Sequence, residues 1–317
     1  METTKLVIAV PAYNEEAMLP ITVPAMLGVL KSMIDKKKIS DSSRLLFVND
    51  GSKDNTWEEI LAAKDKDYHV TGISFSRNSG HQNALIAGLQ VAKDADAIVT
   101  IDADLQDDIN AIEKMVDKFN NGYEVVYGVR NNRDTDSAFK RTTANAFYKT
   151  MSVMGAKTIP NHADFRLLSR RAADAVLEFP ERNLFLRGII PLVGFKSTEV
   201  YYARKEREAG ESKYPINKMI KFAVDGITSF STVPLRVILW LGLVSVLVAI
   251  GLIIMTFFQN AAGHTASGWS SLMVSIWFVG GAQLVSIGVL GEYLGKVFFE
   301  VKRRPRFFIE LDEYTEN

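Results

Sequence analysis

Two aspartates separated by one alanine, Asp102 and Asp104, are the residues of this sequence best suited to chemistry. They directly follow a short apolar run, 97–101, of the kind that forms a buried strand. Two carboxylates this close repel each other unless a cation lies between them, and oxygen ligands suit Mg²⁺ or Mn²⁺. Gln106 adds an amide oxygen two residues further on. The spacing therefore predicts a divalent-metal site with Asp102, Asp104 and Gln106 as candidate ligands.

The alternative is a solvated acidic loop, because Asp107 and Asp108 follow and Asp is common just before helices. The elements around the motif favour the metal site. Apolar runs typical of strands alternate with helical stretches: the runs are Leu6–Val10, Leu45–Val48, Val70–Phe75, Ala97–Ile101 and Val125–Gly128, and the helices Glu15–Lys37, Thr56–Lys66, Gln82–Lys93 and Ile109–Asn120. This alternation predicts an α/β fold with a mostly parallel sheet covered by helices on both faces.

Polar clusters follow four of the predicted strands, and in such sheets ligands bind beyond the carboxyl ends of the strands. The clusters are Pro11–Glu16, Asn49–Asn55, Arg77–Gln82 and Asp102–Asp108. We expect them to form one site. Asp50, at one strand end, can accept a hydrogen bond from a nucleobase N–H or a ribose hydroxyl, whereas its neighbours Gly51, Ser52 and Asn55 are typical turn residues.

The last third of the chain contains two hydrophobic runs, Val237–Phe258 and Ser270–Gly291, each long enough to cross a bilayer and free of Lys, Arg, Asp and Glu. The link between them has no Lys or Arg. Basic residues flank the pair instead: Arg236 before the first run, and Lys296, Lys302, Arg303, Arg304 and Arg306 after the second. Because basic residues stay on the cytoplasmic side, we expect a cell-membrane protein with two spans and both termini in the cytoplasm.

These features predict the domain organisation. We expect a cytoplasmic domain over 1–214, an amphipathic helix over 215–234, spans over 235–258 and 270–292, an extracytoplasmic loop over 259–269, and a basic cytoplasmic tail over 293–317. The helix beginning at Pro215 has apolar residues at helical spacing and lysines on another face, which is typical of a helix in the membrane interface. The alternative is a helix packed on the soluble domain.

Composition excludes several functions. Lys plus Arg and Asp plus Glu both number 37, so no overall charge favours nucleic acid as a partner. The chain has no Cys, which excludes disulfides and thiolate metal sites. The first ten residues are too short and too polar for a signal peptide.

Taken together, the motifs resemble those of family 2 glycosyltransferases with the GT-A fold. The resemblance is carried by Val10-Pro11-Ala12-Tyr13-Asn14-Glu15-Glu16, Asn49-Asp50-Gly51-Ser52, Arg77-Asn78-x-Gly80 and Asp102-Ala103-Asp104-Leu105-Gln106. Further features narrow the resemblance to one group within this family: Asp164-Phe165-Arg166, the segment Arg207–Lys213 and the two C-terminal spans. The whole chain is similar to the polyisoprenyl-phosphate glycosyltransferases, which include bactoprenol glucosyltransferases and dolichol-phosphate mannose synthases.

The resemblance implies roles for individual residues. Nucleotide-sugar binding falls to Pro11, Tyr13, Glu15, Asp50 and Asp102, with Arg207, Ser212 and Lys213 in a loop that closes over the diphosphate. Acceptor phosphate binding falls to Arg130, Arg141 and Arg166, although each arginine can instead be a surface or ion-paired residue. Asp164 is either a catalytic base or the residue that orients Arg166.

The implied reaction is metal-dependent, inverting transfer of a hexose from a UDP-sugar to a polyisoprenyl phosphate. The resemblance favours UDP-glucose over UDP-N-acetylglucosamine, and undecaprenyl phosphate as acceptor in a bacterium. It also implies a homo-oligomer, a tetramer in relatives. A processive polysaccharide synthase is less compatible, since the Gln-x-x-Arg-Trp segment is absent. Two spans enclose no transport pathway. A non-catalytic membrane-tethered nucleotide-sugar binder remains the alternative of another class.

Overall fold

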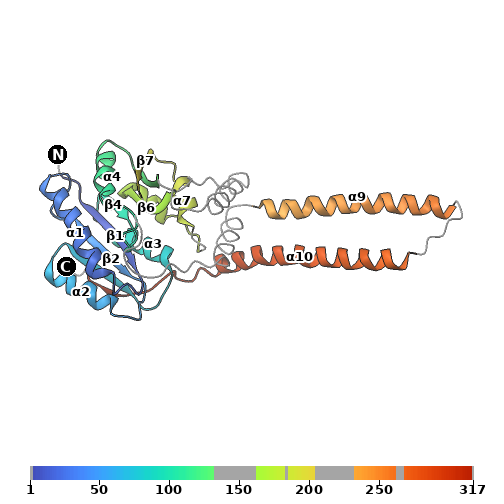
Figure 1. The fold of residues 1–317 in the computed structure, drawn as a ribbon, viewed down its shortest axis with the longest axis horizontal. Coiled ribbons are helices and arrows are strands. Elements are labelled where there is room, and N and C mark those ends of the chain that lie inside the picture. Colours follow the sequence, from blue (N-terminus) through green and yellow to red (C-terminus); the bar gives the residue numbers. More distant parts are fainter. Residues whose placement is uncertain (1–2, 132–161, 183–184, 204–231, 262–267, 316–317) are drawn as a thin grey trace. The chain divides into compact units, whose positions relative to one another are not determined.

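The computed structural model of the protein describes residues 3–131, 162–182, 185–203, 232–261 and 268–315 (Figure 1). The chain divides into two compact units. The first consists of Met1–Lys149, Lys157–Pro215 and Arg304–Asn317, and the second is built mainly from Ile216–Arg303. All but the last residues of the predicted interfacial helix, 215–234, lie outside the described residues.

The first unit is organised around one sheet. Its described strands are β1 Leu6–Ala12, β2 Arg44–Asn49, β3 Val70–Phe75, β4 Ala97–Thr100, β5 Val125–Arg130, β6 His162–Ser169, β7 Ser197–Tyr202 and β8 Ile309–Asp312. Their spatial order is β7-β5-β6-β4-β1-β2-β3-β8. Strands β6 and β8 run antiparallel to their neighbours, and the remaining pairings are parallel. The sheet is therefore mostly parallel, as predicted.

Helices cover both faces of the sheet because alternate strand residues point to opposite sides. Leu6, Ile8 and Val10 of β1 belong to a core shared with α1, α2 and α4, whereas Val7 and Ala9 belong to a second core shared with α3, α6 and α7. The helices are α1 Leu19–Asp35, α2 Thr56–Lys66, α3 His81–Val91, α4 Ala111–Asn120, α6 Arg170–Leu177 and α7 Leu186–Leu192 (Figure 1). The five strands and four helices predicted along the first part of the chain are present.

Strand β6 was not predicted. It inserts antiparallel between β4 and β5, a position for which the sequence predicted no strand. The apolar pattern is interrupted because two polar residues, Asp164 and Arg166, are buried at alternate positions of this strand. Charged residues are rarely buried without a partner, so this stretch does not have the usual appearance of a central strand.

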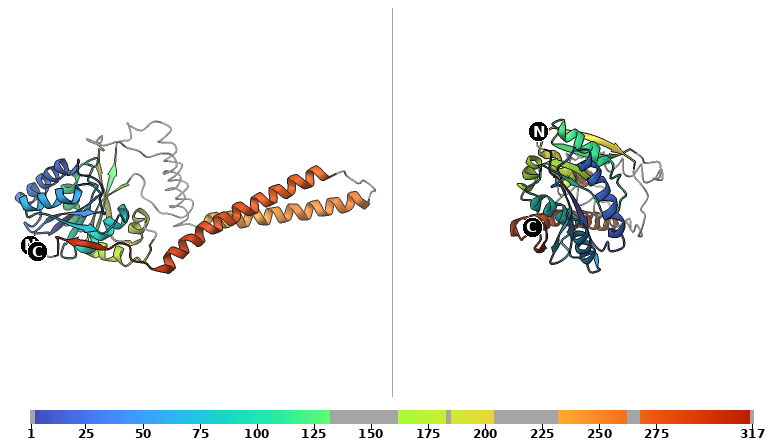
Figure 2. Two further views of the ribbon diagram at one scale, coloured as in Figure 1. Left: turned by 90° about the horizontal axis from the view of Figure 1, so that it is seen from below. Right: turned by 90° about the vertical axis from the view of Figure 1, so that its left-hand side faces the viewer.

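The C-terminal segment differs most from expectation, because the described part of the predicted basic tail, 293–315, contains the end of a helix and a strand of the sheet. Helix α10 continues to Lys302, and residues 304–315, here called the C-terminal strap, return to the sheet and add β8 along β3 (Figure 2). Phe307 stacks on Phe75 with ring centroids 4.7 Å apart. Arg306 Nη2 donates to the carbonyl oxygens of Phe179 and Glu181, at 2.6 and 2.9 Å.

The second unit contains α9 Val233–Ala261 and α10 Trp269–Lys302, which contact each other. Among the described residues, one helical segment is long and apolar enough to cross a membrane, Val233–Leu252, with a mean hydropathy of 2.4. Its apolar side chains are exposed, as at Leu239 (71 %) and Trp240 (64 %). One of the two predicted spans is thus supported, and the second stays a prediction.

Candidate active site

The predicted site residues converge where the strand order reverses. The chain passes from β1 to β2 and β3 on one side, then crosses to β4 on the other side of β1. Pairing of β1 with β4 ends at Ala9 and Thr100, whereas pairing of β1 with β2 continues to Ala12 and Asn49. Such a switch point is where α/β sheets bind ligands.

Pro11 lies in a central strand, where a missing N–H normally removes a hydrogen bond of the sheet. Ala9 faces β4, since its carbonyl accepts from Ile101 N, and Pro11 two residues later faces the same side. By that point β4 has stopped pairing. The residue is therefore tolerated because the sheet opens beside it.

The segments after β1 and β2 are joined by hydrogen bonds from backbone N–H groups to side-chain oxygens. Asn14 N donates to Ser52 Oγ at 3.0 Å, Glu15 N donates to Thr56 Oγ1 at 2.8 Å, and Lys53 N donates to Asn14 Oδ1 at 2.9 Å. This network fixes the segment that carries Tyr13, whose side chain remains 41 % exposed. An exposed aromatic ring on a rigid loop is available to a ligand.

Asp50 is 3 % exposed and binds the loop after β3. Its Oδ1 accepts from Ser79 N at 2.6 Å and its Oδ2 accepts from Gly80 N at 2.9 Å. Burial raises the pKa of Asp50, while these two N–H groups act to lower it. In this structure Asp50 therefore orients the Arg77–Gln82 cluster. For the predicted contact with a nucleoside, one of these two oxygens must accept a second hydrogen bond.

Gly51 makes the approach of these two loops feasible. Its φ is +62°, a conformation that favours glycine, and an added Cβ would lie 2.4 Å from the carbonyl carbon of Arg77. A side chain at this position would push the 77–80 loop away from Asp50. Gly51, which the sequence suggested was only a turn residue, thus sets the distance between the loops after β2 and β3.

The Asp102–Gln106 loop follows β4 and is held from both ends. Thr22 Oγ1 of α1 donates to the carbonyl of Ala103 at 2.6 Å, and Gln106 N donates to Asp104 Oδ1 at 3.2 Å. Leu105 adopts a positive φ of 53°, which turns the chain back within the loop. Asp102 and Asp104 are consequently placed on a short, constrained turn at the switch point.

Asp102 has the chemistry of a metal ligand. Its Oδ1 is buried and has no hydrogen bond among the described residues, although 38 % of the side chain is exposed. Burial raises the pKa of Asp102 to about 6, and the His81 charge acts in the opposite direction. Nearby Asp164, Asp107 and Asp104 add to the increase. A divalent cation would relieve this crowding of negative charge, so the donor set fits Mg²⁺ or Mn²⁺.

Within the described ranges, no group of three or more His, Asp or Glu side chains is arranged to hold a metal ion. Mg²⁺ commonly uses one or two carboxylates and completes its coordination with waters and substrate phosphates. The pair Asp102 and Asp104 has the composition of such a substrate-completed site.

Asp164 forms the centre of a charged cluster beside the Asp102–Gln106 loop, in which Asp164 and Arg166 are buried. Its carboxylate accepts from Arg166 Nη2 and from Arg187 Nε and Nη2, the latter two at 3.2 Å. His81 Nε2 lies 3.5 Å from Asp164 Oδ2 and equally 3.5 Å from Asp102 Oδ1. Burial acts to raise the pKa of Asp164, but Arg187, His81 and Arg166 hold it well below its usual range. The group is therefore an ionised anchor and a very weak base.

Arg130 belongs to a second cluster at the same edge of the sheet. Its Nε and Nη2 donate to Asp107 Oδ1 at 3.1 and 2.9 Å, and Tyr202 OH donates to the same oxygen at 2.7 Å. Burial lowers the pKa of Arg130, but the Asp107 charge more than offsets it and raises the pKa overall. The guanidinium is therefore cationic, with 27 % of the side chain exposed.

The structure thus brings together Pro11, Tyr13, Glu15, Asp50, Asp102, Asp104, Gln106, Arg130, Asp164 and Arg166 at one edge of the sheet. Four predicted residues lie outside the described residues: Arg141, Arg207, Ser212 and Lys213. Sequence reasoning missed His81, Asp107, Arg187 and Tyr202 as partners of the site. His81 lay inside a polar cluster that the sequence marked, and Asp107 followed the Asp102–Asp104 pair; Arg187 and Tyr202 had no local signal.

Comparison with known proteins gives a consistent assignment. The family described as glycosyl transferase family 2 matches residues 7–177, and the family described as GtrB C-terminal hairpin matches residues 233–297. The uncharacterized glycosyltransferase YkoT of Bacillus subtilis (strain 168) is 50 % identical over 312 residues, covering 98 % of this chain and 93 % of that protein. The bactoprenol glucosyl transferase of Shigella phage SfII is 41 % identical, covering 96 % of this chain and 97 % of that protein.

Among solved structures, glucosyl-3-phosphoglycerate synthase from Mycobacterium tuberculosis aligns with a TM-score of 0.46 and 16 % identity, over 71 % of this chain and 78 % of that one. Similarity this low carries no information on donor, metal or acceptor. The family matches and the near full-length relatives do establish the class of enzyme. The chain is a glycosyltransferase and belongs to glycosyl transferase family 2.

Proposed function

We propose that this enzyme transfers a hexose from a UDP-sugar to a polyisoprenyl phosphate at the membrane, with inversion at the anomeric carbon. The observation that carries the proposal is the buried Asp102 Oδ1, which lacks a hydrogen bond among the described residues and lies at the switch point beside Asp104. Relatives named bactoprenol glucosyl transferase at 41 % identity support a lipid acceptor and glucose as the first sugar to test.

At the donor end, Pro11, Tyr13, Glu15 and Asp50 form the nucleoside pocket. The interlocked loops hold the exposed Tyr13 ring where a base can stack on it. A divalent cation bound by Asp102 and Asp104, with the amide of Gln106, would stabilise the negative charge of the leaving diphosphate as a Lewis acid. Arg207, Ser212 and Lys213 would close over that diphosphate.

At the acceptor end, Arg130 binds the lipid phosphate. Asp107 and Tyr202 hold its Nε and Nη2 in one orientation, and the exposed part of the side chain can present N–H donors to a phosphate. Arg141 is a second candidate. Arg166 is only 1 % exposed and paired with Asp164, an arrangement that suits holding the site together better than touching the acceptor.

No strong general base is required, because a phosphate monoester is already ionised near neutral pH, its second pKa being about 6. This agrees with the lowered pKa of Asp164, which would make it a poor proton acceptor. We therefore assign Asp164 to orienting Arg166, Arg187 and His81. The acceptor oxygen itself is the nucleophile in a single displacement.

The membrane part would bring the lipid head group to the catalytic unit. We retain the prediction of two spans with both termini in the cytoplasm, since basic residues flank the two hydrophobic runs and are absent between them. The 215–234 segment would lie in the interface. The homo-oligomer, a tetramer in relatives, remains a prediction that chemical crosslinking in membranes can test.

The test uses the full chain in lipid nanodiscs with radiolabelled UDP-glucose and undecaprenyl phosphate. Transfer of label to lipid should require added Mg²⁺ or Mn²⁺ and should stop with EDTA. Asp104→Asn should reduce kcat/KM by about 10³-fold, since Lewis-acid stabilisation contributes several kcal/mol. The matched control is Asp108→Asn, an acid of the same loop that accepts from Asn110 N and lies outside the predicted ligands; it should retain activity.

Full activity of Asp104→Asn, or full activity after chelation, would refute the metal-assisted mechanism. A parallel reaction uses UDP-N-acetylglucosamine as the donor. The mass of the lipid product, measured by mass spectrometry, shows which of the two sugars is transferred. Binding of UDP-sugars without any release of UDP would favour the non-catalytic binder.

A further inference from the structure

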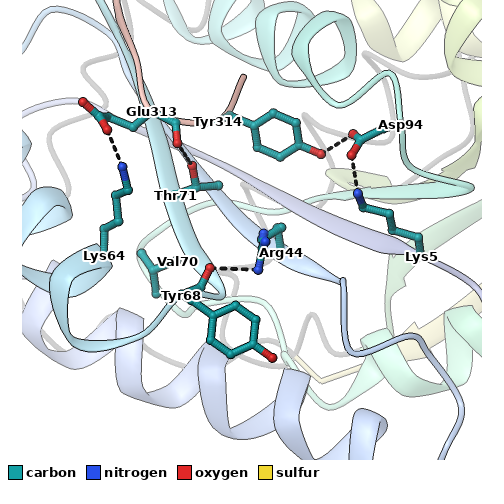
Figure 3. A pocket seen from close by; sticks show the side chains of 9 residues that line it. All are labelled: Lys5, Arg44, Lys64, Tyr68, Val70, Thr71, Asp94, Glu313 and Tyr314. Atoms are coloured by element: carbon teal, nitrogen blue, oxygen red, sulfur yellow. Dashed lines mark hydrogen bonds and ion pairs between the residues drawn. The ribbon is translucent and has the colours of Figure 1, made fainter. Parts of the chain in front are cut away.

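The first unit contains a cavity of about 300 Å³, whose lining residues are drawn in Figure 3. It lies at the opposite end of the strands from the site just described. Lys5 immediately precedes β1, while Arg44 and Val70 begin β2 and β3. The C-terminal strap forms another wall through Glu313 and Tyr314. This cavity therefore belongs entirely to the first unit and shares none of the predicted catalytic residues.

Three cations line the cavity, and two of them have carboxylate partners. Lys5 is paired with Asp94, and Lys64 is paired with Glu313 (Figure 3). Arg44 has no carboxylate partner among the described residues. Its Nη1 donates to the Tyr68 carbonyl at 2.9 Å, and its guanidinium carbon lies 5.1 Å from the centre of the Tyr68 ring. The lining thus carries one more positive charge than negative charge.

The position of Arg44 suits anion binding. The stacking on Tyr68 and the bond to a backbone carbonyl fix the guanidinium plane, so little rotamer freedom is left to lose on binding. A guanidinium has five N–H donors in a fork that matches phosphate and carboxylate oxygens. One donor is used by the Tyr68 carbonyl. The ammonium groups of Lys5 and Lys64 each have three donors and can add contacts from the sides.

We propose that this cavity is a second binding site, for a small phosphate- or carboxylate-bearing anion anchored by Arg44. The site does not depend on the proposed transfer reaction, because it lies at the other edge of the sheet. Its occupant would contact strand starts and strap together, and so would stabilise the folded catalytic unit when bound.

The experiment titrates the full chain, in a maltoside detergent with EDTA present, with inorganic phosphate and separately with malonate. Binding is followed by the rise of the melting temperature and by isothermal calorimetry. The parent protein should show saturable binding of at least one probe, and Arg44→Gln should weaken the dissociation constant at least tenfold. Comparing the two probes distinguishes a phosphate site from a carboxylate site.

Two controls make the result specific. Arg171→Gln removes an arginine that also stacks on an aromatic ring, Phe195 at 4.2 Å, but is paired with Glu124; it should bind like the parent. Arg130→Gln removes the proposed acceptor-phosphate arginine and should also retain binding. Loss of phosphate binding in Arg130→Gln but not in Arg44→Gln would place the anion in the active site and overturn the proposal, as would the absence of saturable binding of both probes.

If Arg44→Gln does not fold, Arg44→Lys retains the charge without the fork and should still weaken binding several-fold. Binding equal to that of the parent in Arg44→Lys would contradict the role of the guanidinium. Binding of UDP with Mn²⁺ should be unchanged in the Arg44 variants, which separates this site from the donor site.

Discussion

Two aspartate–arginine clusters lie at the carboxyl edge of the sheet, and among the described residues only the first contains a fully enclosed arginine. In the first, Asp164 holds Arg166, Arg187 and His81; Arg166 is 1 % exposed, whereas the side chain of Arg187 is 29 % exposed. In the second, Asp107 holds Arg130 together with Tyr202, and Arg130 remains 27 % exposed. Both carboxylates are buried.

The difference separates two uses of the same ion pair. In the first cluster the fully enclosed Arg166 bonds Asp164 of its own strand β6, and Asp164 also lies 3.5 Å from His81 at the start of α3. In the second cluster the carboxylate orients an arginine that still reaches solvent, so its charge can act on a ligand. Four changes test this contrast, from the largest expected effect to the smallest.

Arg166→Gln should have the largest effect, on stability. Removing one partner of a buried pair leaves Asp164 with less compensation, and such changes typically cost about 3–5 kcal/mol. Urea denaturation of the full chain in detergent, followed by near-ultraviolet circular dichroism, measures the loss. Arg171→Gln, which removes an exposed arginine paired with Glu124, is the control and should denature like the parent. Equal stability of Arg166→Gln and the parent would remove the distinction between the clusters.

Arg130→Gln should act on the acceptor. Hydrogen bonds to charged groups contribute about 1.5–3 kcal/mol, so the KM for polyisoprenyl phosphate should rise roughly 10- to 100-fold. The KM for the UDP-sugar should stay within about twofold, because the two substrates use different residues. Steady-state kinetics in nanodiscs gives both constants. A similar rise in both would show that Arg130 supports the whole site instead of the acceptor.

His81 links the first cluster to the Asp102–Gln106 loop, since its Nε2 lies 3.5 Å from both Asp102 and Asp164. Partners of metal ligands typically contribute 10- to 100-fold in metal affinity, and we expect the lower end here. His81→Leu should weaken Mn²⁺ binding in the presence of UDP about tenfold, as measured by electron paramagnetic resonance. His81→Gln keeps a donor at a similar distance and should restore most of it. If His81→Leu and His81→Gln bound Mn²⁺ with the same affinity, the result would argue against a hydrogen-bonding role of His81 at Asp102.

The pH dependence of stability is expected to be the smallest effect, confined to acid. Arg187, His81 and Arg166 face Asp164 and hold its pKa well below the ordinary value of 3.8. A lowered carboxyl pKa stabilises the fold above the ordinary pKa, and this contribution is lost as the pH falls below about 4. The urea midpoint of the parent should therefore decrease more steeply from pH 5 to pH 3 than that of Asp164→Asn. If the urea midpoints of the parent and Asp164→Asn decreased equally between pH 5 and pH 3, the result would contradict a lowered pKa of Asp164.

Local patterns were sufficient to predict the parallel core of the sheet and the loops that carry the site. Each of these features depends on residues that are close in the sequence. An apolar run is followed by a polar turn at its carboxyl end, as in Ala97–Thr100 followed by Asp102 and Asp104. The sheet topology then brings the four loops together without any further information from the sequence.

Features that depend on distant partners were not predictable in this way. Strand β8 forms because Ile309–Asp312 pairs with β3, which is distant in the sequence. The basic residues before this stretch made it resemble a tail. Arg187 and Tyr202 likewise enter the site only through folding, by contacts with Asp164 and Asp107. The buried polar pair of β6 concealed a central strand, because its alternating charges interrupt the apolar pattern.

The position of β8 has a consequence for biosynthesis. Along the chain, the two long helices Val233–Ala261 and Trp269–Lys302 lie between the described strands β1 to β7 and strand β8. A ribosome therefore releases Ile309–Asp312 only after both hydrophobic segments have emerged. Until then the β3 edge stays open, with unpaired N–H and C=O groups that invite wrong partners. Completion of the described sheet would thus wait until both hydrophobic segments had been synthesised, so that a nascent chain stalled before this point would carry an unfinished catalytic unit.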